Sequence, residues 1–218
     1  MPSLFHRLFL FFLFTSLTQC SHLTHYQGDY HYIRQPPSPA PTRNISVFVD
    51  SQFGDADKVE ITKAVEQWNY ALNGYLTLNI VSYQTPTDPE TRLKIRDGGG
   101  LLFVRIKSND PLIGELHYSP LTLGFVYPTI GGNYVYLIRD RLWNESVKPV
   151  SMHEIGHALG AIHTDGGLMN PTFYPYMYQC IDQIALEEVA EYQRLPANKL
   201  NWCYYGEDSL NPKQLRPQ

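Results

Sequence analysis

The chain has 218 residues, the size of one globular domain with short additional segments, and 43% of them are hydrophobic, enough to form a core. A formal net charge of −4 provides no basic surface, so nucleic acid is not expected as a partner. No internal repeat is present, which argues against a repeat architecture.

The N-terminus has the pattern of an export signal. Arg7 precedes the apolar run from Leu8 to Phe14, which is too short to span a bilayer and has the length of a signal-peptide core. We therefore predict that residues 1–19 are a signal peptide and that the protein is exported.

Cys20 follows this run in the sequence Leu17-Thr18-Gln19-Cys20, which resembles a bacterial lipobox. In that motif the cysteine carries a lipid and becomes the first residue, although Gln19 departs from the usual small residue. Two interpretations remain open: a lipoprotein anchored to the cell envelope, either at the outer membrane and periplasm or at the cell surface, and a secreted protein with a simply cleaved signal. The membrane is expected as a partner only through this lipid.

Residues 20–43 are predicted to be the lipidated N-terminus and a linker. They have little apolar periodicity and contain the proline-rich run from Pro36 to Pro41, which is typical of an extended spacer. The folded domain is expected over residues 44–205, and residues 206–218 are expected to be a C-terminal tail.

The domain begins with a predicted strand from Ile45 to Asp50, followed by a helix. Asp57 and Glu60 form a capping-box pattern at the helix start, and Gly74 is the expected stop. Apolar residues recur at helical spacing between them: Ile61, Ala64, Val65, Trp68 and Leu72. Four further strands, rich in β-branched and aromatic residues, are predicted at Tyr75 to Val81, Leu101 to Ile106, Leu123 to Tyr127 and Tyr134 to Ile138.

A second helix is expected from about Ser146, the candidate N-cap, with Pro149 in its first turn. It carries the sequence H-E-x-x-H. Since His153 and His157 are four residues apart, both imidazoles lie on one helical face and can bind the same zinc ion. Glu154 leaves the helix in another direction, which suits a general base acting on a zinc-bound water.

Three residues after His157, Gly160 can end the helix in a left-handed conformation and turn the chain so that His163 reaches the metal. Three protein ligands leave the fourth zinc position open, as in catalytic sites. A bare H-E-x-x-H also arises in ordinary amphipathic helices, but the added glycine and third histidine favour one catalytic zinc ion bound by His153, His157 and His163.

A last helix is predicted from about Ile181 to Leu195, with Pro196 as its terminator. Its apolar stripe is expected to contain Ile184, Ala185, Val189 and Tyr192. Cys180 and Cys203 flank this helix and form an even pair in an exported chain, which predicts a disulfide; two buried thiols are the alternative.

The complete motif, H-E-x-x-H-x-x-G-x-x-H followed by Met169, resembles the signature of the metzincin metallopeptidases. The element order is similar to that of the matrixin catalytic domain, and the zinc helix also resembles that of the serralysins. The resemblance implies an α+β, zincin-like fold: a twisted mixed five-stranded sheet, two main helices above a cleft and a C-terminal helix below it. It also makes Met169 a structural element of a turn beneath the zinc.

The resemblance implies substrate-binding residues as well. Gly124, Phe125 and Val126 correspond to the edge strand with which a metzincin substrate pairs, although an ordinary sheet strand is the alternative. Pro171, Phe173 and Tyr174 correspond to the wall of the specificity pocket, which favours a hydrophobic residue after the scissile bond. Astacins and serralysins have a tyrosine where this chain has Pro171, and Tyr174 is the nearest substitute.

Two further expectations concern metal binding. Asp165 could orient His163 through a hydrogen bond or simply cap the turn. Matrixins carry a structural zinc and calcium loops, but here only His117 lies in the relevant region, so structural zinc and calcium are not predicted.

Together these features predict a monomeric zinc endopeptidase that hydrolyses internal bonds of a protein or peptide substrate, with Glu154 activating the zinc-bound water. Two alternatives remain open. One is a catalytically idle surface module of the same fold that binds a partner, against which the intact Glu154 argues. The other is a zinc hydrolase acting on a non-peptide amide.

Overall fold

The structure, a computed structural model, describes residues 30–38, 42–84, 99–129, 132–172 and 180–205. Its centre is a five-stranded sheet of order β3-β2-β4-β6-β5. Strands β2 (Arg43–Asp50), β3 (Leu76–Gln84), β4 (Leu101–Ile106) and β6 (Gly132–Ile138) are parallel, while β5 (Gly124–Thr129) runs antiparallel to β6 at one edge. The five predicted strands are confirmed, and the sheet is mixed.

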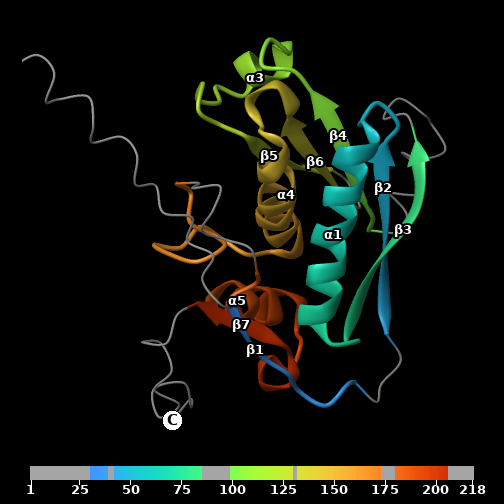
Figure 1. Ribbon diagram of the computed structural model, residues 1–218, viewed down its shortest axis with the longest axis vertical. Helices are drawn as coiled ribbons and strands as arrows, with labels where there is room; N and C mark the ends of the chain where they lie inside the picture. The colour runs from blue at the N-terminus through green and yellow to red at the C-terminus, as the bar shows by residue number, and fades with distance from the viewer. Residues whose placement is uncertain (1–29, 39–41, 85–98, 130–131, 173–179, 206–218) are drawn as a thin grey trace, which may run out of the picture.

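Two long helices cover one face of this sheet, α1 (Asp55–Leu72) and α4 (Asn144–Leu159), and they lie side by side (Figure 1). A core of apolar side chains fills the space between sheet and helices, with Trp68 as its largest buried member. The Trp68 indole N–H donates to the Met152 carbonyl oxygen at 2.9 Å, which ties α1 to α4. The helix that carries the H-E-x-x-H residues is therefore packed against both the sheet and α1.

The opposite face of the sheet carries a second, smaller apolar cluster. The short helix α3 (Pro111–Glu115) lies above it, as does the segment that leads to β5. Phe125 is part of this cluster and stacks between Tyr118 and Tyr136, with ring centroids 4.3 and 4.8 Å away. Because side chains alternate along a strand, Phe125 points away from α4 while its neighbours Gly124 and Val126 face that helix.

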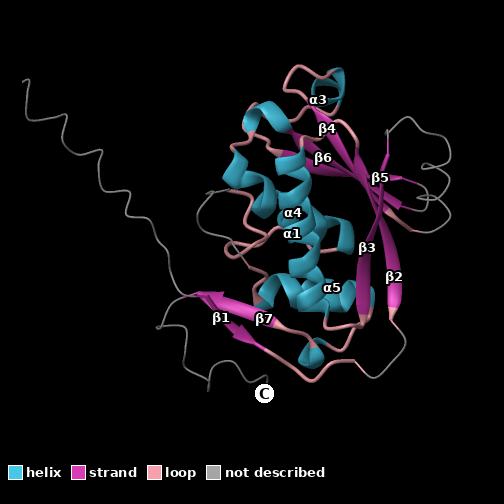
Figure 2. Cartoon of the chain, turned by 45° about the vertical axis from the view of Figure 1, so that its right-hand side comes forward, coloured by secondary structure: helices cyan, strands magenta, loops and turns pink. Residues whose placement is uncertain are grey.

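Helix α5 (Gln183–Gln193) packs against α4 at one end of the molecule, beside a two-stranded sheet of β1 (Tyr30–Ile33) and β7 (Trp202–Tyr205) (Figure 2). Two 3₁₀ turns, η2 (Arg139–Arg141) and η3 (Ala197–Lys199), complete the described elements. The structure contains the expected disulfide between Cys180 and Cys203, which closes the segment holding α5.

Residues 30–33, assigned above to the linker, thus form a strand of the folded part. The chain beyond them is also bound, since the Gln35 N–H donates to Asn201 Oδ1 at 2.6 Å and the Ser38 N–H to the Asn73 carbonyl oxygen at 3.1 Å. This pairing could not be predicted from the sequence, because the partner strand, β7, lies about 170 residues later and only tertiary folding brings the two together.

The predicted start of α1 was wrong, whereas the helix ends directly before the predicted stop, where Asn73 and Gly74 are both left-handed. The helix begins at Asp55 after Gly54, and Asp57, the expected N-cap, is instead a buried residue of its first turn. Its carboxylate pairs with Arg139, with Nε 2.8 Å from Oδ2, so a tertiary ion pair replaces the local cap. At the other end Asn73, one residue before the predicted Gly74, is the left-handed C-cap (φ 48°).

Two predictions for the later helices also need correction. Helix α4 begins at Asn144 with Trp143 as its N-cap, so Ser146 is a buried first-turn residue and Pro149 lies in the second turn. In α5, Ile184 and Tyr192 are 53% and 70% exposed, so they lie outside the buried stripe predicted for them, whereas Ala185 and Val189 are fully buried. Helix α5 starts two residues later than expected, after its N-cap Asp182.

Within the described residues, no helix has both the length and the apolar character needed to cross a bilayer.

Candidate metal centre

Three histidines converge at the C-terminal end of α4. The Nε2 atom of His157 lies 3.0 Å from Nε2 of His153 and 3.1 Å from Nε2 of His163. In the described part of the chain they form the one group of three or more histidine, cysteine or acidic side chains able to hold a metal ion. The sequence prediction of these three side chains as a cluster is therefore confirmed.

The histidine tautomers follow from the carbonyl groups around them. His153 Nδ1 lies 2.7 Å from the Leu168 carbonyl oxygen, and His157 Nδ1 lies 2.8 Å from that of Ala161. Since a carbonyl oxygen only accepts hydrogen bonds, both Nδ1 atoms carry the proton. Burial lowers the pKa of His153 to about 4 and also lowers that of His157, so both rings are neutral near pH 7 and their Nε2 atoms have free lone pairs.

These lone pairs fit a metal ion and little else. Two neutral Nε2 acceptors 3.0 Å apart repel each other unless a cation lies between them. Two ligands of a tetrahedral zinc, at Zn–N distances of about 2.0–2.1 Å, are roughly 3.3 Å apart, close to the spacing seen here. The donor set, three imidazoles and no thiolate, suits zinc but does not by itself fix which ion is bound.

His163 reaches the cluster because the chain reverses after α4. Gly160 is left-handed (φ 108°), and the Gly160 and Ala161 N–H groups donate to the carbonyl oxygens of His157 and Gly156 at 3.0 and 2.9 Å. This pair of bonds is a Schellman motif. Gln193 of α5 satisfies another end carbonyl, that of Leu159, at 2.9 Å. The glycine stop predicted from the sequence is therefore present and brings the third histidine back.

Glu154 lies beside the histidines on α4 and is almost fully buried. Its Oε2 atom has no hydrogen-bond partner, and burial raises the pKa of its carboxyl group to about 8. Tyr118 is close enough for the Glu154 charge to raise the pKa of its hydroxyl, after the larger effect of burial. A buried carboxyl group without a partner, adjacent to three converging imidazoles, is what a general base or acid requires.

Gly124 of β5 lies against this carboxyl group. A Cβ atom at position 124 would be 3.0 Å from Glu154 Oε1, so the absence of a side chain lets the strand pass directly over the glutamate. The same strand is the edge of the sheet, as expected for Gly124, Phe125 and Val126. The metzincin resemblance pointed to these three residues only as part of an edge strand. No pattern in the sequence predicts the contact between Gly124 and Glu154.

Met169 is fully buried below α4. A Cβ atom at Gly156 would lie 2.6 Å from its Sδ atom, so the methionine fills the space that the glycine leaves. Its main-chain carbonyl accepts from the Thr164 N–H at 3.0 Å, which closes the turn after His163. Met169 is therefore a buried apolar residue packed against the underside of α4.

The remaining expected site residues are placed only in part. Pro171 is exposed, and Phe173, Tyr174 and Cys20 lie outside the described residues. Asp165 is exposed; its carbonyl oxygen accepts from Asn170 Nδ2 at 3.3 Å, while the contacts of the described residues contain no bond from its carboxylate to His163. Orientation of His163 by Asp165 therefore stays a prediction.

Sequence reasoning missed Asp182, which binds the segment before Met169. Its Oδ2 atom accepts from the Leu168 N–H at 2.6 Å, and its Oδ1 atom accepts from the Ala185 N–H at 3.1 Å as the N-cap of α5. An aspartate directly before a helical pattern is a cap signal that could have been found. The bond to Leu168 could not, because it joins distant segments.

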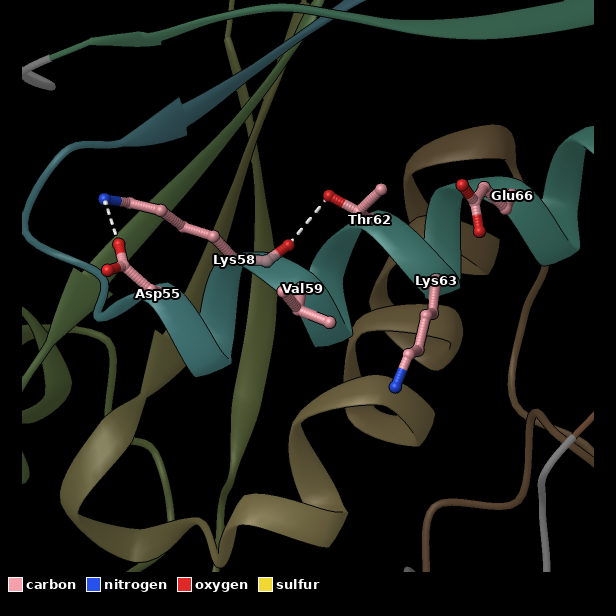
Figure 3. A pocket seen from close by; sticks show the side chains of 6 residues that line it. All are labelled: Asp55, Lys58, Val59, Thr62, Lys63 and Glu66. Atoms are coloured by element: carbon pink, nitrogen blue, oxygen red, sulfur yellow. Dashed lines mark hydrogen bonds and ion pairs between the residues drawn. The ribbon is translucent and has the colours of Figure 1, made fainter.

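A surface depression elsewhere holds none of these residues. It is lined by one face of α1, namely Asp55, Lys58, Val59, Thr62, Lys63 and Glu66 (Figure 3). Its charges are mixed and partly paired, with Lys58 Nζ 3.7 Å from Asp55 Oδ1. This depression therefore lacks the convergence of unpaired groups seen at the three histidines.

Comparisons with known proteins add little to this geometry. No family model matches the chain, and neither does any curated protein. Among solved structures, metalloproteinase-II from Bacteroides fragilis matches with 14% identity and a TM-score of 0.44, covering 76% of this chain. The match spans 58% of the length of that protein, and a likeness this weak carries no information about activity. What the described residues themselves define is an α+β protein with a three-histidine centre able to bind a metal ion.

Proposed function

We propose that the protein is a zinc-dependent endopeptidase. The observation that carries the proposal is the pairing of two features on α4: neutral Nε2 atoms of His153 and His157 that face each other at 3.0 Å, and the buried, partnerless carboxyl group of Glu154 beside them. A purely structural zinc site has four protein ligands and needs no adjacent base.

His153, His157 and His163 would hold the ion. When bound, zinc supplies Lewis acidity at the scissile carbonyl and at the attacking water. Glu154 takes the proton from that water and delivers it to the leaving amine. Burial raises the pKa of Glu154 in the metal-free protein, and the positive charge of a bound ion would lower it again, which makes the carboxylate form available to accept the proton.

The geometry of β5 supports a polypeptide as substrate. The Ile138 N–H donates to the Leu123 carbonyl oxygen at 2.9 Å, so these residues form a hydrogen-bonded pair, and such pairs alternate along an antiparallel ladder. Phe125 and Tyr127 therefore direct their main-chain groups to β6. Gly124 and Val126 direct theirs to the free edge, where an extended peptide can pair with them next to Glu154. A small non-peptide amide would have no use for this edge.

The finer assignment is part of the same proposal. The H-E-x-x-H-x-x-G-x-x-H sequence and Met169 support a metzincin, matrixin-like subtype, with a cleft between β5 and the segment after Met169. Pro171, Phe173 and Tyr174 would then form the wall that receives a hydrophobic residue after the scissile bond. The N-terminal sequence supports export and an envelope-anchored lipoprotein with Cys20 as the acylated residue, with secretion as the alternative.

The test is cleavage of a peptide library by the purified protein, analysed by mass spectrometry with and without a zinc chelator. Glu154→Gln keeps the size of the side chain and removes the base, so turnover should be lost while the zinc content stays at one ion per chain. Glu66→Gln, the same change on the exposed face of α1, should have wild-type activity. Internal cuts that persist in Glu154→Gln would refute the assigned base, and stoichiometric zinc without any cuts would favour a binding module.

A further inference from the structure

The main chain of Leu168 is bound on both sides, and one of its partners is a candidate metal ligand. Its carbonyl oxygen accepts from His153 Nδ1 at 2.7 Å, and its N–H donates to Asp182 Oδ2 at 2.6 Å. The residue is 2% exposed, so water does not replace either bond. The N–H belongs to the peptide unit before the Leu168 Cα atom and the carbonyl group to the unit after it, so the main chain of this one residue connects the aspartate to the imidazole.

Asp182 is itself held in place by several contacts. Its Oδ1 atom caps α5 through the Ala185 N–H, and its main chain forms a β-bridge with Cys203. Gly167 is left-handed (φ 67°) and lies so close that a Cβ atom there would be 2.4 Å from Asp182 Oδ2. The Cys180–Cys203 disulfide closes the same segment two residues before the aspartate. The carboxylate is therefore a fixed point against which the turn before Met169 rests.

We propose that Asp182 is a positioning residue for the candidate metal ligand His153, acting through the main chain of Leu168. This inference rests on the proposed metal site but not on peptidase activity. According to this proposal, Asp182, the N-cap of α5, influences how tightly the three histidines bind the metal ion.

Positional restraint carries the coupling. The carboxylate fixes the peptide unit that enters Leu168, and this restrains the buried main chain whose carbonyl oxygen holds the His153 ring with Nε2 turned toward His157. Loss of the direct partner of a ligating histidine typically lowers metal affinity by about 10- to 100-fold. An Asp182 variant keeps that direct partner and loosens only its position, so we expect a loss near the lower end of this range.

Asp182→Ser separates this role from helix capping. Serine is a good N-cap, so its hydroxyl can still accept from the Ala185 N–H, but its single oxygen cannot also reach the Leu168 N–H. Asp110→Ser makes the same change at the N-cap of α3, where the Asp110 side chain accepts from the Leu112 N–H at 3.0 Å. Val189→Ala, a buried apolar change further along α5, controls for lost stability.

The readout is zinc affinity by chelator competition on the full-length protein, together with the visible absorption spectrum of the cobalt-substituted protein, which reports ligand geometry. Asp182→Ser should bind zinc about 10-fold more weakly than wild type and alter the cobalt spectrum. Asp110→Ser and Val189→Ala should leave both unchanged. If Asp182→Ser does not fold, Asp182→Asn serves in its place, because its single oxygen can satisfy only one of the two N–H groups.

Wild-type affinity and spectrum in the folded Asp182 variant would overturn the inference, as would an equal loss in Val189→Ala. A wild-type protein that binds no zinc would instead refute the proposed function. The two failures are therefore distinguishable.

Discussion

Gly124 of β5 faces the carboxyl group of Glu154, and a Cβ atom at this position would lie 3.0 Å from both Glu154 Oε1 and the Tyr136 carbonyl oxygen. The edge strand and the candidate base thus meet at a residue without a side chain. Any larger residue would have to displace either the carboxyl group or the strand.

Gly124→Ala should therefore impair catalysis more than folding. The added methyl group pushes on Glu154, so we expect kcat/KM for a peptide to fall about 10-fold or more, with unchanged zinc content and a loss of stability of about 1–2 kcal/mol. Gly114→Ala is the matched control, because a Cβ atom there has nothing within 4 Å. Wild-type kinetics in Gly124→Ala would mean that the carboxyl group has room to move.

The burial of Glu154 predicts a pH dependence of stability in the metal-free protein. Folding raises the pKa of its carboxyl group from 4.5 to about 8, so the folded state binds the proton more tightly than the unfolded state. The contribution of Glu154 is then most favourable below pH 4.5, falls as the pH rises to about 8 and is constant above that. The total change is on the order of a few kcal/mol.

Urea unfolding of metal-free wild type and Glu154→Gln between pH 4 and 9 measures the contribution of Glu154 to the free energy of unfolding. The stability of wild type relative to the variant should decline across that window. A difference that does not change with pH would show that the carboxyl group is hydrated or has found a partner.

The burial of His153 predicts that the stability of the metal-free protein falls as the pH is lowered, which is opposite to the trend expected for Glu154. Burial lowers the pKa of its imidazole from 6.5 to about 4, so its contribution to stability is complete above pH 6.5 and is lost as the pH falls toward 4. Replacing His153 with Gln should flatten the acid side of the stability curve of the metal-free protein. An unchanged acid limb in this variant would show that other groups govern it.

Substitutions at Gly156 and Met169 should have strongly coupled effects on the free energy of unfolding. A methyl group at position 156 would lie 2.6 Å from Met169 Sδ and 3.3 Å from Trp68 Cζ2, so Gly156→Ala should cost about 1–3 kcal/mol of unfolding free energy. Met169→Ala alone should also be destabilising, because it leaves a cavity. In the double variant the new methyl group occupies part of that cavity, so the sum of the two losses should exceed the measured loss by about 1 kcal/mol. Denaturant unfolding of all four proteins provides the cycle, and strict additivity would contradict the contact.

The Asp57–Arg139 pair should matter more than an exposed one. Arg139 Nε lies 2.8 Å from Asp57 Oδ2, and both side chains are largely buried. Arg139→Met leaves a buried carboxylate alone and should cost about 3–5 kcal/mol, whereas Asp57→Asn combined with Arg139→Met should recover part of this. Asp55→Ala, which removes the exposed Lys58–Asp55 pair, should cost under about 1 kcal/mol. Similar thermal shifts for the two pairs would show that Asp57 is solvated.

The sequence predicted elements well wherever the signal was local. The apolar spacing of Ile61, Val65 and Trp68 identified α1, and the β-branched and aromatic runs identified the five strands, because burial on one face imposes those periods. It failed at helix starts. Asp57 looks like a cap, but a partly buried arginine 82 residues later binds its carboxylate, and no short-range pattern shows this.

The candidate site divides in the same way. The sequence by itself determined the ligand set, because His153 and His157 share a helical face and Gly160 permits the turn that returns His163; each step depends on backbone geometry over a few residues. Only the tertiary structure decided the rest: the carbonyl groups of Leu168 and Ala161 that fix the histidine tautomers, the glycine of β5 that lies against Glu154, and the Asp182 carboxylate behind Leu168. Every residue has a main-chain carbonyl group, so the sequence does not show which of these groups will bind a histidine. Contacts between segments far apart in the chain exist only once the sheet and helices have packed.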